Sequence, residues 1–90
     1  MNLPKGYKLK RGIEFDKQLG RYLWHPKEND LFYFEETKTI FKYIEWVAYL
    51  KGAWMTMDGY AKVKDMSDSL HDTFWTNNIE VRKCIPIEVI

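Results

Sequence analysis

The sequence predicts an α+β fold, in which a small antiparallel β-sheet packs against one main α-helix. Three observations lead to this prediction: a hairpin pattern over residues 20–36, an amphipathic helical pattern over residues 38–51, and alternating apolar residues near the C-terminus. The sheet would consist of an N-terminal meander and the C-terminal strand. Ninety residues, 46% of them hydrophobic and 17% aromatic, fit a single compact domain spanning residues 1–90.

The hairpin of residues 20–36 is predicted to turn through residues 26–30, so that His25 faces Leu31. In this register one side carries only aromatic side chains, which are Tyr22, Trp24, Phe32 and Phe34. Each ring buries roughly 150–250 Å², so we expect that side to be core. The other side mixes polar and apolar side chains, namely Arg21, Leu23, His25, Leu31, Tyr33 and Glu35. A shift of one residue in register would exchange the two sides.

The main helix is predicted over residues 38–51, with Gly52 directly after its last residue. Its apolar side follows the i, i+4, i+7 spacing of a helix through Ile40, Ile44 and Val47. Because this segment begins close after the hairpin, we expect the helix to fold back on the aromatic side with little loop-closure entropy to overcome.

Four further elements complete the predicted fold. They are a first strand near residues 6–15, a hairpin that turns at Asp58-Gly59 between 54–57 and 60–64, a short second helix near 68–76, and a strand over 79–89. The Asp-Gly pair is typical of a type I′ turn, and continuation of the main helix past residue 51 is the alternative. Pro86 predicts that the last strand lies at an edge of the sheet or turns its missing N–H toward solvent.

Charge and cysteine content set bounds on the compartment and the ligands. The formal net charge of +1 gives no overall attraction to nucleic acid or to an anionic membrane. A single cysteine, Cys84, excludes an internal disulfide and favours a reducing compartment. The N-terminus lacks the apolar run of a signal peptide, and no apolar stretch approaches the length of a membrane span. We therefore expect a cytoplasmic protein that does not bind a membrane.

No residue pattern predicts catalysis, a metal site or a cofactor. The only imidazole and thiol ligands are His25, His71 and Cys84, and their spacing matches no metal motif. The group Ser67, Ser69, His71 and Asp72 is better explained by helix capping than by a catalytic triad, because neighbours on one short helix point in different directions. These observations predict a protein that is not an enzyme.

Protein binding is the preferred function. Interfaces are enriched in aromatic residues, Met and Arg, and two patches have this composition. The first is the mixed side of the hairpin, with Arg21, Leu23, His25, Leu31 and Tyr33; the second comprises Trp54, Met55 and Met57. Ordinary internal packing explains either patch equally well. The expected partner is another protein, or a second copy in a homodimer.

Single-stranded nucleic-acid binding is the alternative, because basic residues beside exposed aromatic rings hold single strands. The basic residues gather near the N-terminus, and the expected site comprises Tyr7, Lys8, Lys10, Arg11 and Lys17. Residue types with AT-rich codons are abundant, as in many low-GC bacteria and their viruses. Small size and this bias together favour a regulatory or inhibitory accessory protein of a virus or mobile element, acting on a host protein in the host cytoplasm.

Overall fold

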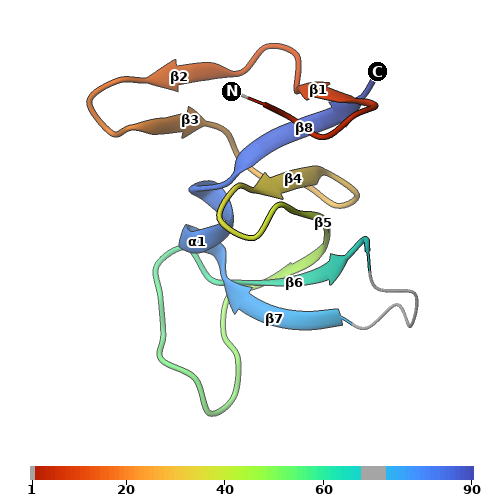
Figure 1. Ribbon diagram of the computed structural model, residues 1–90. Helices are drawn as coiled ribbons and strands as arrows, with labels where there is room; N and C mark the ends of the chain where they lie inside the picture. The colour runs from red at the N-terminus through yellow and green to blue at the C-terminus, as the bar shows by residue number, and fades with distance from the viewer. Residues whose placement is uncertain (1, 68–72) are drawn as a thin grey trace.

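The structure is a computed structural model that describes residues 2–67 and 73–90. These residues form eight strands and one short helix: β1 (Tyr7–Leu9), β2 (Glu14–Asp16), β3 (Arg21–Leu23), β4 (Leu31–Phe34), β5 (Thr39–Val47), β6 (Tyr60–Asp65), β7 (Thr73–Asn77), α1 (Asn78–Arg82) and β8 (Ile85–Val89). Six strands build one sheet in the order β1-β8-β4-β5-β6-β7, in which every neighbouring pair is antiparallel. Strands β2 and β3 form a separate two-stranded sheet near β8 (Figure 1).

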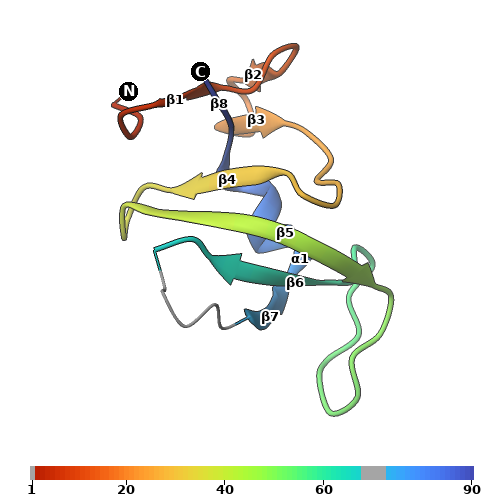
Figure 2. The same ribbon diagram turned by 90° about the vertical axis from the view of Figure 1, so that its right-hand side faces the viewer.

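The predicted α+β fold with one main helix is wrong, because the protein is mostly β-sheet. Residues 39–47 of the expected helix form the longest strand, β5, between β4 and β6 (Figure 2). This segment is dense in β-branched and aromatic residues, which fit a pleated sheet better than a helix. Sequence composition therefore favoured a strand, whereas the spacing of its apolar residues favoured a helix.

A β-bulge explains the helical spacing. Tyr43 faces Val63 on β6, but Glu45 faces Lys62, so two steps along β5 match one step along β6 and Ile44 is the extra residue. An inserted residue locally changes the two-residue repeat of a strand to three. The apolar positions on the two sides of the bulge thus acquire a spacing that resembles a helical period.

The predicted hairpin of residues 20–36, and the meander that contained it, are also wrong. Strand β3 pairs with β2, whereas Leu31 on β4 faces Lys42 and Ile87 and not His25. The residues before β4 bond to β5 instead of β3, since the Asn29 N–H donates to the Tyr43 carbonyl at 2.7 Å. The chain between the two strands therefore crosses from one sheet to the other.

The core prediction for the aromatic side is confirmed for two of its four residues. Trp24 and Phe32 are 4% and 3% exposed, and their ring centroids lie 6.1 Å apart. Tyr22 is half-buried and Phe34 is exposed. Trp24, which directly follows β3, and Phe32 on β4 thus meet in the core although β3 and β4 are not paired.

The C-terminal half confirms some predicted strands and corrects the helix. The helix expected near 68–76 falls partly on residues 68–72, outside the described residues, and its remainder belongs to β7. Instead, α1 begins after Asn77, whose side-chain oxygen accepts from the Ile79 N–H at 2.9 Å. An asparagine at this position caps a helix, because its side-chain oxygen satisfies a free N–H of the first turn.

Strand β8 occupies the second half of the predicted strand 79–89, but it lies between β1 and β4 and not at an edge. The Lys10 N–H donates to the Pro86 carbonyl at 3.0 Å. Pro86 has no N–H, so it cannot donate the second hydrogen bond of this pair to Lys10. Strand β1 accordingly ends at Leu9, which faces Ile87.

The hairpin expected at Asp58-Gly59 and the continued helix are both wrong. Strand β6 begins at Tyr60, close to the prediction, but it pairs with β5 and β7, and residues 54–57 belong to a loop. A long β5–β6 connection therefore replaces the tight turn.

Two groups of buried side chains hold the fold together. One contains Trp24, Phe32, Tyr43, Ala61, Val63, Val81 and Cys84, and the other contains Tyr33, Ile85 and Ile87. Val81 of α1 is 2% exposed, so the helix covers the sheet face that carries Phe32 and Val63 (Figure 2). Within the described residues, no helix is both long and apolar enough to cross a membrane.

Candidate functional site

The connection between β5 and β6, residues 48–59, stands away from the sheet, and we call it the projecting loop (Figures 1 and 2). Three large apolar side chains in the C-terminal half of this loop are largely exposed: Trp54 at 91%, Met55 at 79% and Met57 at 102%. These residues form the second patch of the sequence analysis. Large apolar side chains gathered on one exposed loop are characteristic of an interaction site.

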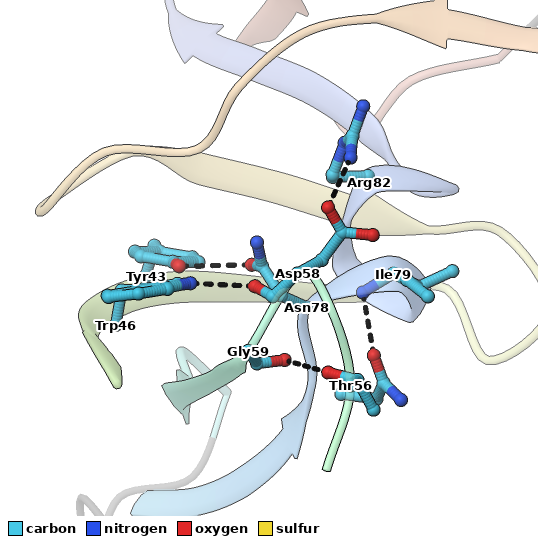
Figure 3. Close-up of polar contacts among 9 residues, drawn as sticks. Tyr43, Trp46, Thr56, Asp58, Gly59, Asn78, Ile79 and Arg82 are labelled. Atoms are coloured by element: carbon cyan, nitrogen blue, oxygen red, sulfur yellow. Dashed lines mark hydrogen bonds and ion pairs between the residues drawn. The ribbon is translucent and has the colours of Figure 1, made fainter. Parts of the chain in front are cut away.

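The base of the projecting loop is fixed by one hydrogen bond from the end of β5 and by one within the loop (Figure 3). The Trp46 indole N–H donates to the Asp58 carbonyl at 2.7 Å, and the Thr56 hydroxyl donates to the Gly59 carbonyl at 3.0 Å. Gly59 adopts a positive φ of 74°, and a Cβ there would lie 2.5 Å from the Val47 carbonyl oxygen. Only glycine fits this close approach.

Helix α1 fixes the same base from its other side (Figure 3). The Asn78 N–H donates to the Gly59 carbonyl at 3.1 Å, and the buried Asn78 side-chain oxygen accepts from the Tyr43 hydroxyl at 3.0 Å. Arg82 forms an ion pair with Asp58 at 3.1 Å. The exposed side chains of the projecting loop therefore lie next to a base that is hydrogen-bonded to both the sheet and the helix.

The residues of the first predicted patch, on the mixed side of the predicted hairpin, do not lie together in the structure. Tyr33 is 6% exposed and packs with Ile85 and Ile87, and the half-buried Leu31 belongs to the same group. The other members, Arg21, Leu23 and His25, lie on or just after β3 in the smaller sheet, where Leu23 and His25 are exposed. That any of these residues binds a partner stays a prediction, but they do not share one surface.

Two of the residues expected to hold nucleic acid are engaged by the rest of the protein. The half-buried Tyr7 packs against the Tyr33 group, and the Lys10 ammonium forms an ion pair with Asp30 at 2.7 Å. Lys8, Arg11 and Lys17 are exposed. The Lys10 charge is thus already matched by a carboxylate of the protein itself.

The structure contains an apolar hollow under α1 that was not predicted from the sequence. Its volume is about 190 Å³, and its lining comprises Phe32, Phe34, Phe41, Val63, Phe74, Thr76, Glu80, Val81 and Cys84. These residues come from four strands, α1 and the segment after it, so their proximity follows from strand order. The alternation of Phe32 and Phe34 was the available signal, but it was assigned to the wrong pairing.

Cys84 is the nucleophilic side chain in this hollow, and its surroundings suppress its reactivity. Burial, with the nearby Glu80 carboxylate adding to the effect, raises the pKa of the Cys84 thiol from its usual 9.0 to about 12. The thiol also donates to the Glu80 carbonyl at 3.4 Å. A protonated, buried thiol is a poor nucleophile, so Cys84 acts as a small core residue.

The raised pKa of Cys84 predicts that the protein becomes less stable in alkaline solution. Between pH 9 and about 12 the unfolded chain releases the thiol proton while the folded protein retains it, so the free energy of unfolding falls as pH rises through this window. Urea unfolding at pH 8 and pH 10.5 should show a smaller decrease for Cys84→Ala than for the wild type. Equal decreases would contradict the prediction. Tyr43, whose pKa burial also raises, remains in both proteins and cancels in the comparison.

Within the described part of the chain, no three His, Cys, Asp or Glu side chains gather as metal ligands would. Comparison with protein-family models, characterised proteins and solved structures found no match. The geometry of the chain itself is therefore the basis for its functional interpretation.

Proposed function

We propose that this chain is a non-enzymatic protein-binding module, a regulator or inhibitor, that contacts its partner through the projecting loop. The observation that carries the proposal is the almost complete exposure of Trp54, Met55 and Met57 on a loop with a hydrogen-bonded base. Burial of one such side chain contributes about 1.5–3 kcal/mol, so three of them provide a strong driving force for association.

The type of side chain supports a protein partner. Tryptophan is among the commonest residues at the energetic centre of interfaces, and methionine adapts its shape to the opposing surface. Trp46 at the end of β5 and Tyr49 in the projecting loop are also exposed, at 52% and 57%. Ordinary internal packing does not account for side chains that are this exposed.

The partner we propose is a protein of a host cell, with a second copy of the chain as the other candidate. The single cysteine supports action in a reducing compartment such as the cytoplasm. The AT-rich bias of the composition supports a virus or mobile element as the origin of the protein.

The double variant Trp54→Ala/Met57→Ala tests the proposal. Capture of the partner from a lysate of the natural host should fall at least about tenfold, the loss expected when a central interface residue is truncated. The free energy of unfolding should change by no more than about 0.5 kcal/mol, since both side chains are exposed. The measurements are quantitative pull-down and urea unfolding.

A matched control removes exposed apolar side chains elsewhere. Phe15→Ala/Leu19→Ala alters the β2–β3 hairpin, where the two side chains are 51% and 57% exposed. This variant should capture the partner as the wild type does, and equal losses would refute a role for the loop. Sedimentation of the purified chain, with and without anionic vesicles, separates self-association and membrane binding from binding to another protein.

A further inference from the structure

The sheet face opposite α1 carries three lysines on adjacent strands. Lys42 on β5 faces Lys64 on β6 directly, and Lys62 lies two residues along β6 on the same side. Their sequence neighbours Phe41 and Val63 point to the opposite side, into the core under α1. We call Lys42, Lys62, Lys64 and the facing Trp75 of β7 the lysine face.

Among the residues that the structure describes, the charge on this face is largely uncompensated. Like charges directly opposite each other on neighbouring strands repel, which makes the Lys42–Lys64 pair unfavourable for folding. Within residues 2–67 and 73–90, none of the ion pairs found within 4 Å includes any of the three ammonium groups. Among the residues that face these three lysines in the strand register, Glu45, opposite Lys62, is the one carboxylate. An arrangement of this kind is relieved when an anion binds.

Trp75 adds an aromatic surface beside these charges. The Lys62 ammonium lies 5.8 Å from the centre of the Trp75 ring, so the two side chains share one side of the sheet. Both residues are half-buried, with part of each side chain accessible. A sheet face that combines lysines with an aromatic ring provides ionic contacts for phosphates and a stacking surface for a base.

We infer that the lysine face binds single-stranded nucleic acid, with the three ammonium groups on successive phosphates and Trp75 stacked on a base. The site shares no residue with the projecting loop or with the N-terminal basic residues of the sequence analysis. It is therefore a second binding activity, and its failure would leave the proposed protein-binding function intact.

The test is fluorescence anisotropy of a labelled twelve-nucleotide oligothymidylate with the full chain. Each phosphate neutralised on a single strand contributes about 0.7 to the slope of log affinity against log salt, so three contacts predict about a 20-fold loss between 50 and 200 mM salt. Lys42→Gln/Lys62→Gln/Lys64→Gln should bind weakly and show almost no salt dependence. Trp75→Leu should weaken binding about tenfold, through the loss of one stacked base.

Lys64→Glu distinguishes loss of the site from loss of the fold. A glutamate at this position would face Lys42 and replace repulsion with attraction, so the melting temperature should rise while oligonucleotide binding is lost. Loss of binding with a lowered melting temperature would overturn the inference.

A variant with the same change in charge serves as the control. Lys8→Gln/Arg11→Gln/Lys17→Gln neutralises three exposed basic residues near the N-terminus and should keep the affinity of the wild type. Equal weakening in both triple variants, no binding at 50 mM salt, or equal affinity for polyglutamate or phosphatidylserine vesicles would each overturn the inference.

Discussion

Replacing Phe32 with alanine should lower the free energy of unfolding by about 3–5 kcal/mol, the range for removal of a buried phenylalanine side chain. Phe32 is 3% exposed, and its ring centroid lies 6.1 Å from that of Trp24 and 5.5 Å from that of Phe41. The substitution removes both ring contacts and leaves a cavity next to the hollow under α1. A ninety-residue domain has a total stability of roughly 5–14 kcal/mol, so this single change removes a large part of it.

Urea unfolding followed by Trp fluorescence measures this effect, and Phe15→Ala is the matched control. Phe15 is also an aromatic strand residue, but it is 51% exposed and its described ring contact is with Tyr22, at 5.0 Å. Its loss should lower the free energy of unfolding by about 1 kcal/mol, the energy of one aromatic pair. Equal effects at the two positions would show that Phe32 does not lie in the core.

Substituting alanine for Gly59 should lower the free energy of unfolding by about 2–5 kcal/mol. The left-handed backbone there, with φ at 74°, is unfavourable for alanine by about 1–2 kcal/mol. The new Cβ would also lie 2.5 Å from the Val47 carbonyl oxygen and 2.7 Å from the Trp46 indole nitrogen, an overlap that adds about 1–3 kcal/mol. Because this indole bonds to Asp58, the base of the projecting loop should shift as well.

Gly52→Ala separates the two contributions to the Gly59 effect. Gly52 has a similar φ of 83°, but a Cβ there would meet no atom within 4 Å. Its substitution should therefore cause only the backbone loss, about 1–2 kcal/mol. If urea unfolding gives equal values at the two glycines, the close approach at Gly59 does not exist. Loss of partner capture in Gly59→Ala but not in Gly52→Ala would show that the fixed base matters for the projecting loop.

The candidate site was predicted only in part. Trp54, Met55 and Met57 were named from residue type, and the structure exposes them. The hydrogen-bonded base was missed because it joins residues that are distant in sequence, such as Tyr43 and Asn78. The lysine face was missed because Lys42 and Lys64 become neighbours only through the β5–β6 pairing.

The helix prediction failed for a local physical reason. The helix was predicted from the spacing of apolar residues along one segment. A bulge at Ile44 gives the apolar residues of a strand a spacing that resembles that of a helix. The composition of residues 39–47, in which seven of nine residues are β-branched or aromatic, carried the correct signal. Where spacing and β-propensity disagreed, propensity was the better guide.

By itself, the sequence determined the buried Trp24 and Phe32, the strand that begins at Tyr60, a strand within residues 79–89, and the apolar side chains of Trp54, Met55 and Met57. These features depend on residue type and on alternation along a short segment. Only the tertiary structure decided that β8 lies between β1 and β4, that β3 leaves β4 for a second sheet, and which side chains face each other across strands. Strand order is set by hydrogen bonds between residues far apart in the chain, and local patterns carry no information about those partners.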